Sequence, residues 1–528
     1  MAAPKPDAES LDRKTLGVLA ATLALSATVY ALVFFPDFVR MGDNQSYYLL
    51  GKGLLEGRGY TSYWTGEAVR HTHWPPGYPI LLAGAMALGI TSITGLKLVN
   101  GAVLLVGLLV TYGWARRLFE DRWVAGITTA AVGLNVVVVQ YASRIMSEVP
   151  FLTVSMGALA CAIRVGRRPG VPWWRDGWFY ALVALMVAAF YIRTLGVALI
   201  AGCILGMILD GRARAAVVGG ALTGVGIAPW ILFVRGARSH SYTDYLSAIE
   251  SDTTGGTIGY LWQRIADNAV AYGGAVFPET MAPGLAPVLE LLPGSGWGLT
   301  ILFGALTAWG LFGLGREGLV PAAYLAATAG VLLLWPSIWA FGRFLIPTVP
   351  VLYGLVTVGA WDVLRRVGGQ AVSPALLLPF LLLLLPALKD ARAYARNPVI
   401  LRYTLYEQIA EAVRQEARPE DKVVAYAPQS MYYLTEQPTL LMPPSDDPRH
   451  VMYSLDRDGV DLVAITGDGA TTPAYRYLVP AIQTFPERFH LVASIPKPAD
   501  EDPIGYPYVA ALYRVLQPEP DEAAAYGP

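Results

Sequence analysis

Long apolar runs dominate the pattern of hydrophobic and polar positions along the chain. Eleven of them have roughly the length that crosses a bilayer: 15–35, 97–117, 122–142, 149–165, 177–193, 195–210, 213–234, 297–314, 318–335, 344–364 and 372–388. A helix needs about 20 apolar residues to span the hydrocarbon layer, so each run predicts a membrane helix. Charged residues gather at the ends of the runs. The pattern therefore predicts a mainly α, polytopic membrane protein with about 11 transmembrane helices.

The basic residues between the runs indicate an orientation. Cytoplasmic turns of membrane proteins are rich in Lys and Arg, and Lys5, Arg13 and Lys14 precede the first run. If residue 1 is inside, all later inside turns are basic as well, with Arg116, Arg117 and Arg122, then Arg164, Arg167, Arg168 and Arg175, then Arg212 and Arg214, then Arg316, then Arg365 and Arg366. We expect a multi-pass protein of the cell membrane, with a cytoplasmic N-terminus and outer loops at 37–79 and 235–296.

One apolar segment, Ile80 to Ile93, is too short for this scheme. It has about 14 residues, and counting it as a crossing would invert every later turn. We interpret it as a half-inserted or interfacial helix, with a short span in a thinned bilayer as the alternative. Within the loop 235–296, we expect surface helices at Tyr242 to Ile249 and at Ile258 to Tyr272.

The chain changes character after residue 390. The pattern predicts a helix at Thr404–Arg418 and strands at Lys422–Tyr426, Asp461–Thr466, His490–Ser494 and Tyr508–Val515. We therefore expect two domains, a transmembrane domain at 1–390 and a small extracytoplasmic α/β domain at 391–528. Neither a Gly-x-Gly-x-x-Gly motif nor a phosphate-binding loop occurs, so the sequence does not support nucleotide binding.

Composition agrees with a membrane protein and excludes other classes. Hydrophobic residues make up 54% of the chain and charged residues 15%, against about 25% charged in soluble proteins. The net charge of −1 argues against a nucleic-acid partner, which calls for a basic face. The two cysteines, Cys161 and Cys203, lie in apolar runs and give neither a disulfide framework nor a metal knuckle.

Two acids are candidates for chemistry at the outer face. Asp43 follows the first apolar run and opens a polar, aromatic loop; as an alternative, it caps a short helix that begins with Asn44. Glu148 lies at the outer end of the third run, where an ion pair with Arg144 is the alternative. Two acids on one face could share a metal ion, or divide the roles of base and orienting group.

Two arginines and a histidine are candidates for phosphate binding on the same face. Arg193 lies in a tight turn between two runs, and Arg343 lies in the sequence Gly-Arg-Phe-Leu-Ile-Pro-Thr-Val-Pro. A guanidinium there would meet a phosphate arriving from the lipid, or would simply reach the headgroups. His73 precedes Trp74-Pro75-Pro76, where an interfacial aromatic cluster is the alternative to metal or phosphate binding.

Four motifs in this order resemble a known family. They are Asp43 with the paired Tyr47 and Tyr48, Trp-Pro-Pro-Gly-Tyr-Pro from Trp74, Ser-Glu-Val-Pro-Phe around Glu148, and the Gly-Arg-Phe-Leu-Ile-Pro segment at Arg343. Together they are similar to the GT-C membrane glycosyltransferases that use polyprenyl-phosphate donors, including protein O-mannosyltransferases and the aminoarabinose transferase of lipid A. The resemblance covers residues 15 to about 365.

The resemblance implies a reaction and a role for each candidate residue. It implies inverting transfer of a single hexosyl or pentosyl unit from a polyprenyl phosphate to a glycan, lipid or protein acceptor on the extracytoplasmic side. Asp43 would be the catalytic base and Glu148 a second acid, and Arg343, Arg193 and His73 would contact the donor phosphate. Trp74 stands where some relatives carry Lys, which weakens that donor contact.

The resemblance leaves three further points as expectations. Tyr47, Tyr48 and Tyr60 are assigned to binding of acceptor and sugar. A divalent metal held by Asp43, Glu148 and His73 is left open, and no nucleotide is expected. The rival function is a flippase or transporter of lipid-linked glycans without catalysis, which predicts acids or broken helices near mid-membrane; the sequence alone indicates neither.

Overall fold

The computed structural model describes residues 13–38, 43–235, 256–292, 294–336, 341–369, 372–396, 401–466, 473–497 and 506–516. The chain divides into two compact units, the first comprising 1–37, 72–81 and 88–397, and the second 38–71, 82–87 and 398–528. Residues 38–71, most of the loop predicted to lie outside, thus group with the C-terminal region. The predicted domain boundary at residue 390 stays a prediction, and the predicted helix at 242–249 lies outside the described residues.

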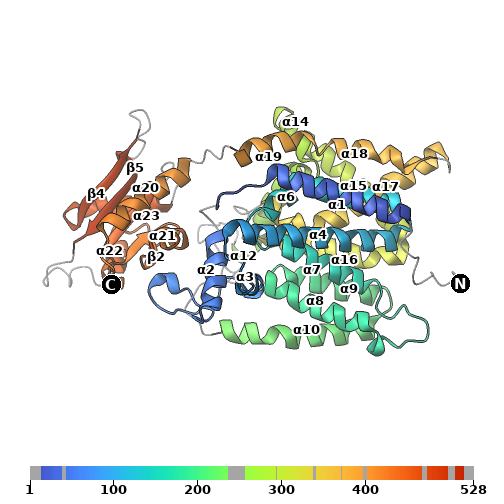
Figure 1. The fold of residues 1–528 in the computed structure, drawn as a ribbon, viewed down its shortest axis with the longest axis horizontal. Helices are drawn as coiled ribbons and strands as arrows, with labels where there is room; N and C mark the ends of the chain where they lie inside the picture. Colours follow the sequence, from blue (N-terminus) through green and yellow to red (C-terminus); the bar gives the residue numbers. More distant parts are fainter. Residues whose placement is uncertain are drawn as a thin grey trace. The chain divides into compact units, whose positions relative to one another are not determined.

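The first unit is a bundle of apolar helices, as the sequence predicts (Figure 1). The helices are α1 Arg13–Val33, α4 Ile93–Phe119, α5 Arg122–Leu134, α6 Val136–Ala142, α7 Glu148–Ala162, α8 Gly177–Ile192, α9 Gly196–Leu209, α10 Ala213–Val234, α12 Gly256–Ala271, α13 Phe277–Met281, α14 Ala286–Leu291, α15 Ser295–Leu314, α16 Leu319–Leu334, α17 Val349–Gly368, α18 Leu378–Leu382 and α19 Pro386–Arg396. The helix predicted at 258–272 corresponds to α12, and its position at the membrane surface stays a prediction.

Fewer helical stretches are long enough to cross a membrane than the eleven crossings predicted from the sequence. Among the described residues, six helical stretches are long and apolar enough to cross a membrane, or up to seven if a bent pair counts as one. The difference arises because α7, α8 and α9 are shorter than their apolar runs, and because 295–334 counts as one stretch of 40 residues. The count of eleven is therefore not confirmed. The short helix α3, Gly77–Ala87, has the length expected of a segment that does not span.

Glycine allows close contact between α9 and α16. A Cβ atom on Gly202 would lie 2.4 Å from the Cα atom of Tyr324, and one on Gly206 would lie 2.5 Å from the Cα atom of Val320. Two small residues four positions apart let membrane helices pack backbone to backbone. The contact between these two helices therefore depends on glycine at both positions.

The run 122–142 is broken, although the sequence predicts one continuous helix. α5 and α6 meet at an angle of 60° at Asn135. The Asn135 carboxamide caps α6 by accepting from the N–H groups of Val137 and Val138, and its Nδ2 donates to the Thr280 carbonyl and the Tyr353 hydroxyl, both at 2.7 Å. A buried Asn satisfied on both sides thus stabilises the bend.

The second unit contains a five-stranded sheet in the order β2-β1-β3-β5-β4. Its strands are β1 Val423–Ala425, β2 Thr439–Leu441, β3 Leu462–Thr466, β4 Phe489–Pro496 and β5 Tyr508–Val515. β1 is parallel to β2 and β3, whereas β5 is antiparallel to β3 and β4. The predicted strands correspond to β1, β3, β4 and β5, while the short edge strand β2 was not predicted.

Helices cover both faces of this sheet (Figure 1). α20 Leu401–Glu416 and α21 Pro428–Thr435 pack on one face with Val423, Ala425, Leu462 and Ala464. α22 Pro448–Asp458 and α23 Pro473–Thr484 pack on the other face with Val424, Val463 and Ile465. Successive strand residues alternate between the two cores, which is why both strands are apolar throughout. The predicted α/β architecture is confirmed.

The first outer loop belongs to this second unit through aromatic contacts that the sequence did not predict. The loop contains α2 Asp43–Leu55 and the 3-10 turn Tyr63–Thr65. Tyr433 of α21 lies edge-on to Phe38 at 5.0 Å and to Tyr48 at 5.7 Å between ring centroids. Tyr63 contacts Tyr432 in the same way. These contacts hold the helix that begins at Asp43 against α21.

Candidate active site

A buried carboxylate lies between two arginines inside the helical unit. Glu148 is fully buried at the first turn of α7, where the helix dipole favours a negative charge. Arg193 Nη1 lies 2.8 Å from Glu148 Oε1, and Arg343 Nη1 lies 4.0 Å from the same oxygen. Three predicted site residues that are far apart in the sequence are thus brought together. The ion-pair partners of Glu148 are Arg193 and Arg343.

The two arginines are held in different ways. Arg193 follows the last residue of α8. Its Nη1 donates a hydrogen bond to Ser147 Oγ at 2.9 Å and also lies within ion-pair distance of Glu148. Arg343 lies in the 3-10 turn Gly342–Phe344, with its guanidinium 5.0 Å from the Phe344 ring centre. The Arg193 guanidinium lies 5.8 Å from the same ring. Phe344 therefore supports both cations.

The charged groups of the cluster differ in how far they are exposed. Two guanidinium groups face one carboxylate, and guanidinium groups stay protonated in proteins. The Arg343 side chain is 23% exposed and the Arg193 side chain 11%, whereas Glu148 is at 0%. The carboxylate thus orients the cations from the buried side, while Arg343 keeps accessible surface. Such an arrangement suits an anion with several oxygens, such as a phosphate.

The motif Trp-Pro-Pro-Gly-Tyr-Pro supports this cluster structurally. A Cβ atom on Gly77 would lie 2.6 Å from the backbone of Tyr191, two residues before Arg193, so only glycine fits there. The Tyr78 hydroxyl accepts a hydrogen bond from Asn100 Nδ2 at 2.9 Å. Asn100 also donates to the carbonyls of residues 144 and 146, just before Glu148. The motif therefore positions the backbone on both sides of the ion pair.

Two supporting residues were missed in the sequence. Asn100 and Lys97 are both buried in α4. Lys97 Nζ donates to the carbonyls of Phe35 at 2.8 Å and Asp37 at 2.5 Å, which fixes the chain where it leaves α1. A polar side chain inside an apolar run was the available signal, because such a residue must find partners in the fold.

Asp43 lies in the second unit. It is the first residue of α2 and is half-buried, and Asn44, Gln45 and Ser46 after it are buried. A carboxylate in the first turn is stabilised by the helix N-terminus, as the capping alternative expects. This position leaves part of the carboxylate accessible, so its assignment as a base stays a prediction.

The aromatic candidates are engaged in packing. Tyr47 is 2% exposed, and Tyr48 lies between Phe38 and Tyr433. Burial, and then the charge of Glu56, raise the pKa of the Tyr48 hydroxyl, so this group stays protonated at neutral pH. Tyr60 lies edge-on to His71, whose Nδ1 lies 2.8 Å from Ser62 Oγ.

The metal site left open by the sequence stays a prediction. His73 packs edge-on against Trp74 at 4.4 Å between ring centroids. Within the described ranges, no three His, Cys, Asp or Glu side chains are grouped so that they could hold a metal ion. Glu148 already faces two guanidinium cations, which would repel a divalent ion.

Comparisons with known proteins define the fold. No family model and no curated protein sequence matches the chain. Among solved structures, ArnT from Cupriavidus metallidurans bound to undecaprenyl phosphate is 14% identical with a TM-score of 0.59, covering 94% of this chain and 98% of that chain. The archaeal oligosaccharyltransferase AglB from Archaeoglobus fulgidus, in complex with an inhibitory peptide and a dolichol-phosphate, is 12% identical with a TM-score of 0.55, covering 86% and 69% respectively. This multi-pass membrane protein therefore has the GT-C fold, as its motifs predicted.

Proposed function

We propose that this protein is an inverting glycosyltransferase that moves a single sugar from a polyprenyl-phosphate donor to an acceptor at the extracytoplasmic face. One observation carries the proposal: Arg193 and Arg343 both lie within ion-pair distance of the buried Glu148, in a chain with the GT-C fold. The solved structures with this fold include complexes with undecaprenyl phosphate and dolichol-phosphate. A lipid-linked donor is thus the ligand class that agrees with both the fold and the charge.

The chemistry follows from how charge moves in the reaction. The acceptor hydroxyl transfers its proton to the Asp43 carboxylate as its oxygen attacks the anomeric carbon. The bond from that carbon to the phosphate oxygen breaks, and its electron pair stays on the phosphate. The phosphodiester with one negative charge becomes a monoester with two.

The arginines act on the charge that develops on the leaving group. Arg343 contacts the phosphate oxygens, and Arg193 with Glu148 holds the site in place. Cations positioned before the reaction stabilise the transition state without reorganisation. No general acid is required, because a phosphate leaves without protonation. Attack from the face opposite to the phosphate inverts the anomeric centre.

The test uses the full-length protein reconstituted in liposomes with a panel of polyprenyl-phosphate sugars. We expect one sugar to be consumed with release of polyprenyl phosphate, and Asp43→Asn to lower turnover by about 100- to 10,000-fold, the usual contribution of a general base. Glu67→Gln, an exposed acid of the same loop, is the matched control and should keep full activity. Normal turnover by Asp43→Asn would remove Asp43 as the base.

The transport alternative makes a different forecast in the same liposomes. A flippase would carry a fluorescent polyprenyl-phosphate sugar across the bilayer without cleaving the bond between sugar and phosphate. If the intact donor crosses the bilayer and no polyprenyl phosphate is released with any acceptor tested, the protein is a transporter and not a transferase.

A further inference from the structure

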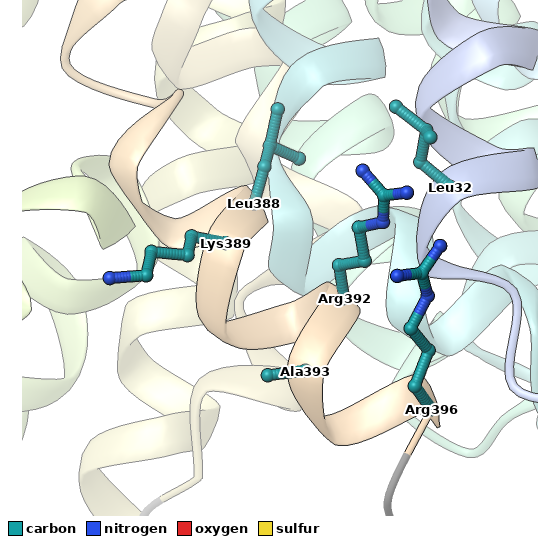
Figure 2. A pocket seen from close by; sticks show the side chains of 6 residues that line it. All are labelled: Leu32, Leu388, Lys389, Arg392, Ala393 and Arg396. Carbon is teal, nitrogen blue, oxygen red and sulfur yellow. The ribbon is translucent and has the colours of Figure 1, made fainter.

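A hollow with a basic wall lies beside α19, apart from the residues assigned to transfer. It has a volume of about 470 Å³ and is lined by Leu32, Leu388, Lys389, Arg392, Ala393 and Arg396. Figure 2 shows that the guanidinium groups of Arg392 and Arg396 both point toward Leu32 of α1, whereas Lys389 points to the opposite side of the helix. The hollow therefore has two cations on one wall and apolar side chains around them.

The position of α19 against α1 is fixed by packing. Ala391 and Ala395 form the buried face of α19, and the Tyr394 ring lies 5.7 Å from the Phe35 ring at the end of α1. Leu388, Arg392 and Arg396 follow at intervals of four residues and form the row next to that buried face. The fold itself thus holds the two guanidinium groups beside α1.

Arg392 and Arg396 are exposed and carry charges of the same sign on one row of α19. Residues four apart on a helix have Cβ atoms about 6 Å apart, and like charges at this spacing destabilise the helix. Across the described ranges, no ion pair or hydrogen bond joins Arg392 or Arg396 to a carboxylate. This contrasts with Arg193 and Arg343, whose charges are partly balanced by Glu148. A phosphate bracketed by two guanidinium groups would remove the repulsion.

The surface around the hollow indicates where the anion comes from. Leu25 and Leu32 of α1 are 45% and 42% exposed, and Leu382 and Leu385 before α19 are 60% and 41% exposed. In a membrane protein these side chains face lipid, so acyl or prenyl chains can reach the hollow along them. A soluble phosphate would gain nothing from this apolar surface.

We propose that Arg392 and Arg396 form a binding site for the anionic phosphate headgroup of a membrane lipid whose chains lie against α1. This site is separate from the donor contacts proposed at Arg193 and Arg343, and it does not depend on the transfer reaction. Its specificity rests on two guanidinium groups held in one place, which distinguishes it from the diffuse attraction of a basic surface to headgroups.

The experiment measures lipid retention by native mass spectrometry of the full-length protein released from phosphatidylcholine nanodiscs with or without phosphatidylglycerol. We expect wild type to keep a phosphatidylglycerol molecule and Arg392→Ala/Arg396→Ala to bind it about 30-fold more weakly, from about fivefold for each charge near a membrane surface. Arg365→Ala/Arg366→Ala removes the same number of charges from exposed positions of α17 that do not line the hollow, so its effect should stay below about fivefold.

Further arms make the result decisive. Arg392→Gln/Arg396→Gln removes the charges but keeps polar side chains with N–H donors, and it serves if the alanine variant fails to fold. An equal loss in Arg365→Ala/Arg366→Ala and in Arg392→Ala/Arg396→Ala would mean that lipid is retained by diffuse attraction and not by a site at α19. Unchanged retention in both double variants of Arg392 and Arg396 would overturn the proposal. Inorganic phosphate that displaces the lipid and raises the unfolding temperature equally would assign the site to a soluble phosphate instead.

Discussion

The protein presents two pairs of arginines that differ in one respect. Arg193 and Arg343 lie beside the buried Glu148, with one contact as short as 2.8 Å, whereas Arg392 and Arg396 line an open hollow next to exposed leucines. A buried carboxylate fixes the geometry of a cation but cancels part of its charge. The first pair is therefore suited to orient a reacting phosphate, and the second to hold a lipid headgroup.

Removing the Glu148 carboxylate should have the largest effect and tests whether the first pair of arginines depends on it. We expect Glu148→Ala to destabilise the protein by about 3–5 kcal/mol, because it leaves a buried guanidinium without its partner. The measurement is the thermal unfolding midpoint in nanodiscs, with the exposed Glu67→Ala as control. The double variant Glu148→Ala/Arg193→Ala should recover part of the loss. If all three variants unfold like wild type, the ion pair has no structural role.

Replacing the more exposed arginine of the first pair tests its contact with the donor. Arg343→Ala should lower kcat/KM for the lipid donor by about 100-fold, the usual effect of losing one group that stabilises developing charge. Arg343→Lys should recover only part of this, because a single ammonium cannot replace a planar guanidinium. Arg168→Ala, an exposed arginine, provides the control in the same transfer assay. An unchanged KM for the donor would count against a phosphate role.

Raising the ionic strength should have the smallest effect of these tests, and it should act differently on the two pairs of arginines. The Debye length falls from about 10 Å at 0.1 M salt to about 3 Å at 1 M, and buried pairs are screened much less than exposed ones. High salt should thus weaken lipid retention at Arg392 and Arg396 several-fold while leaving the unfolding difference between wild type and Glu148→Ala nearly constant. Lipid retention is measured by native mass spectrometry and unfolding by thermal denaturation of the same samples. If salt changed both quantities to the same extent, the two pairs would not differ in burial as described.

The sequence identified most of the site but not its support. The apolar runs, the α/β region and the motifs around Asp43, Glu148 and Arg343 each have a local signal. The pairing of Glu148 with Arg193 had no such signal, because the two residues lie on different helices. Nor did the sequence predict that the first outer loop groups with the C-terminal region through Tyr48 and Tyr433.

The bend at Asn135 and the number of crossings were also beyond the sequence. Hydropathy measures how apolar a run is, and it cannot say where a helix breaks or how much of the run is helical. A single Asn that caps the following helix and bonds to Thr280 and Tyr353 produces the bend, and both of these partners are more than a hundred residues away.

What the sequence alone determined was a membrane protein of mainly helical structure, with a small α/β region and with acids, arginines and aromatic rings at the ends of its apolar runs. These features can be read from the sequence because the free energy of moving a side chain from water to lipid depends mainly on that side chain and its neighbours in the chain. Only the tertiary structure decided which charges meet. An ion pair such as that of Glu148 and Arg193 depends on the packing of α7 against α8, and a guanidinium pair such as Arg392 and Arg396 acquires its apolar surroundings only when α19 lies against α1.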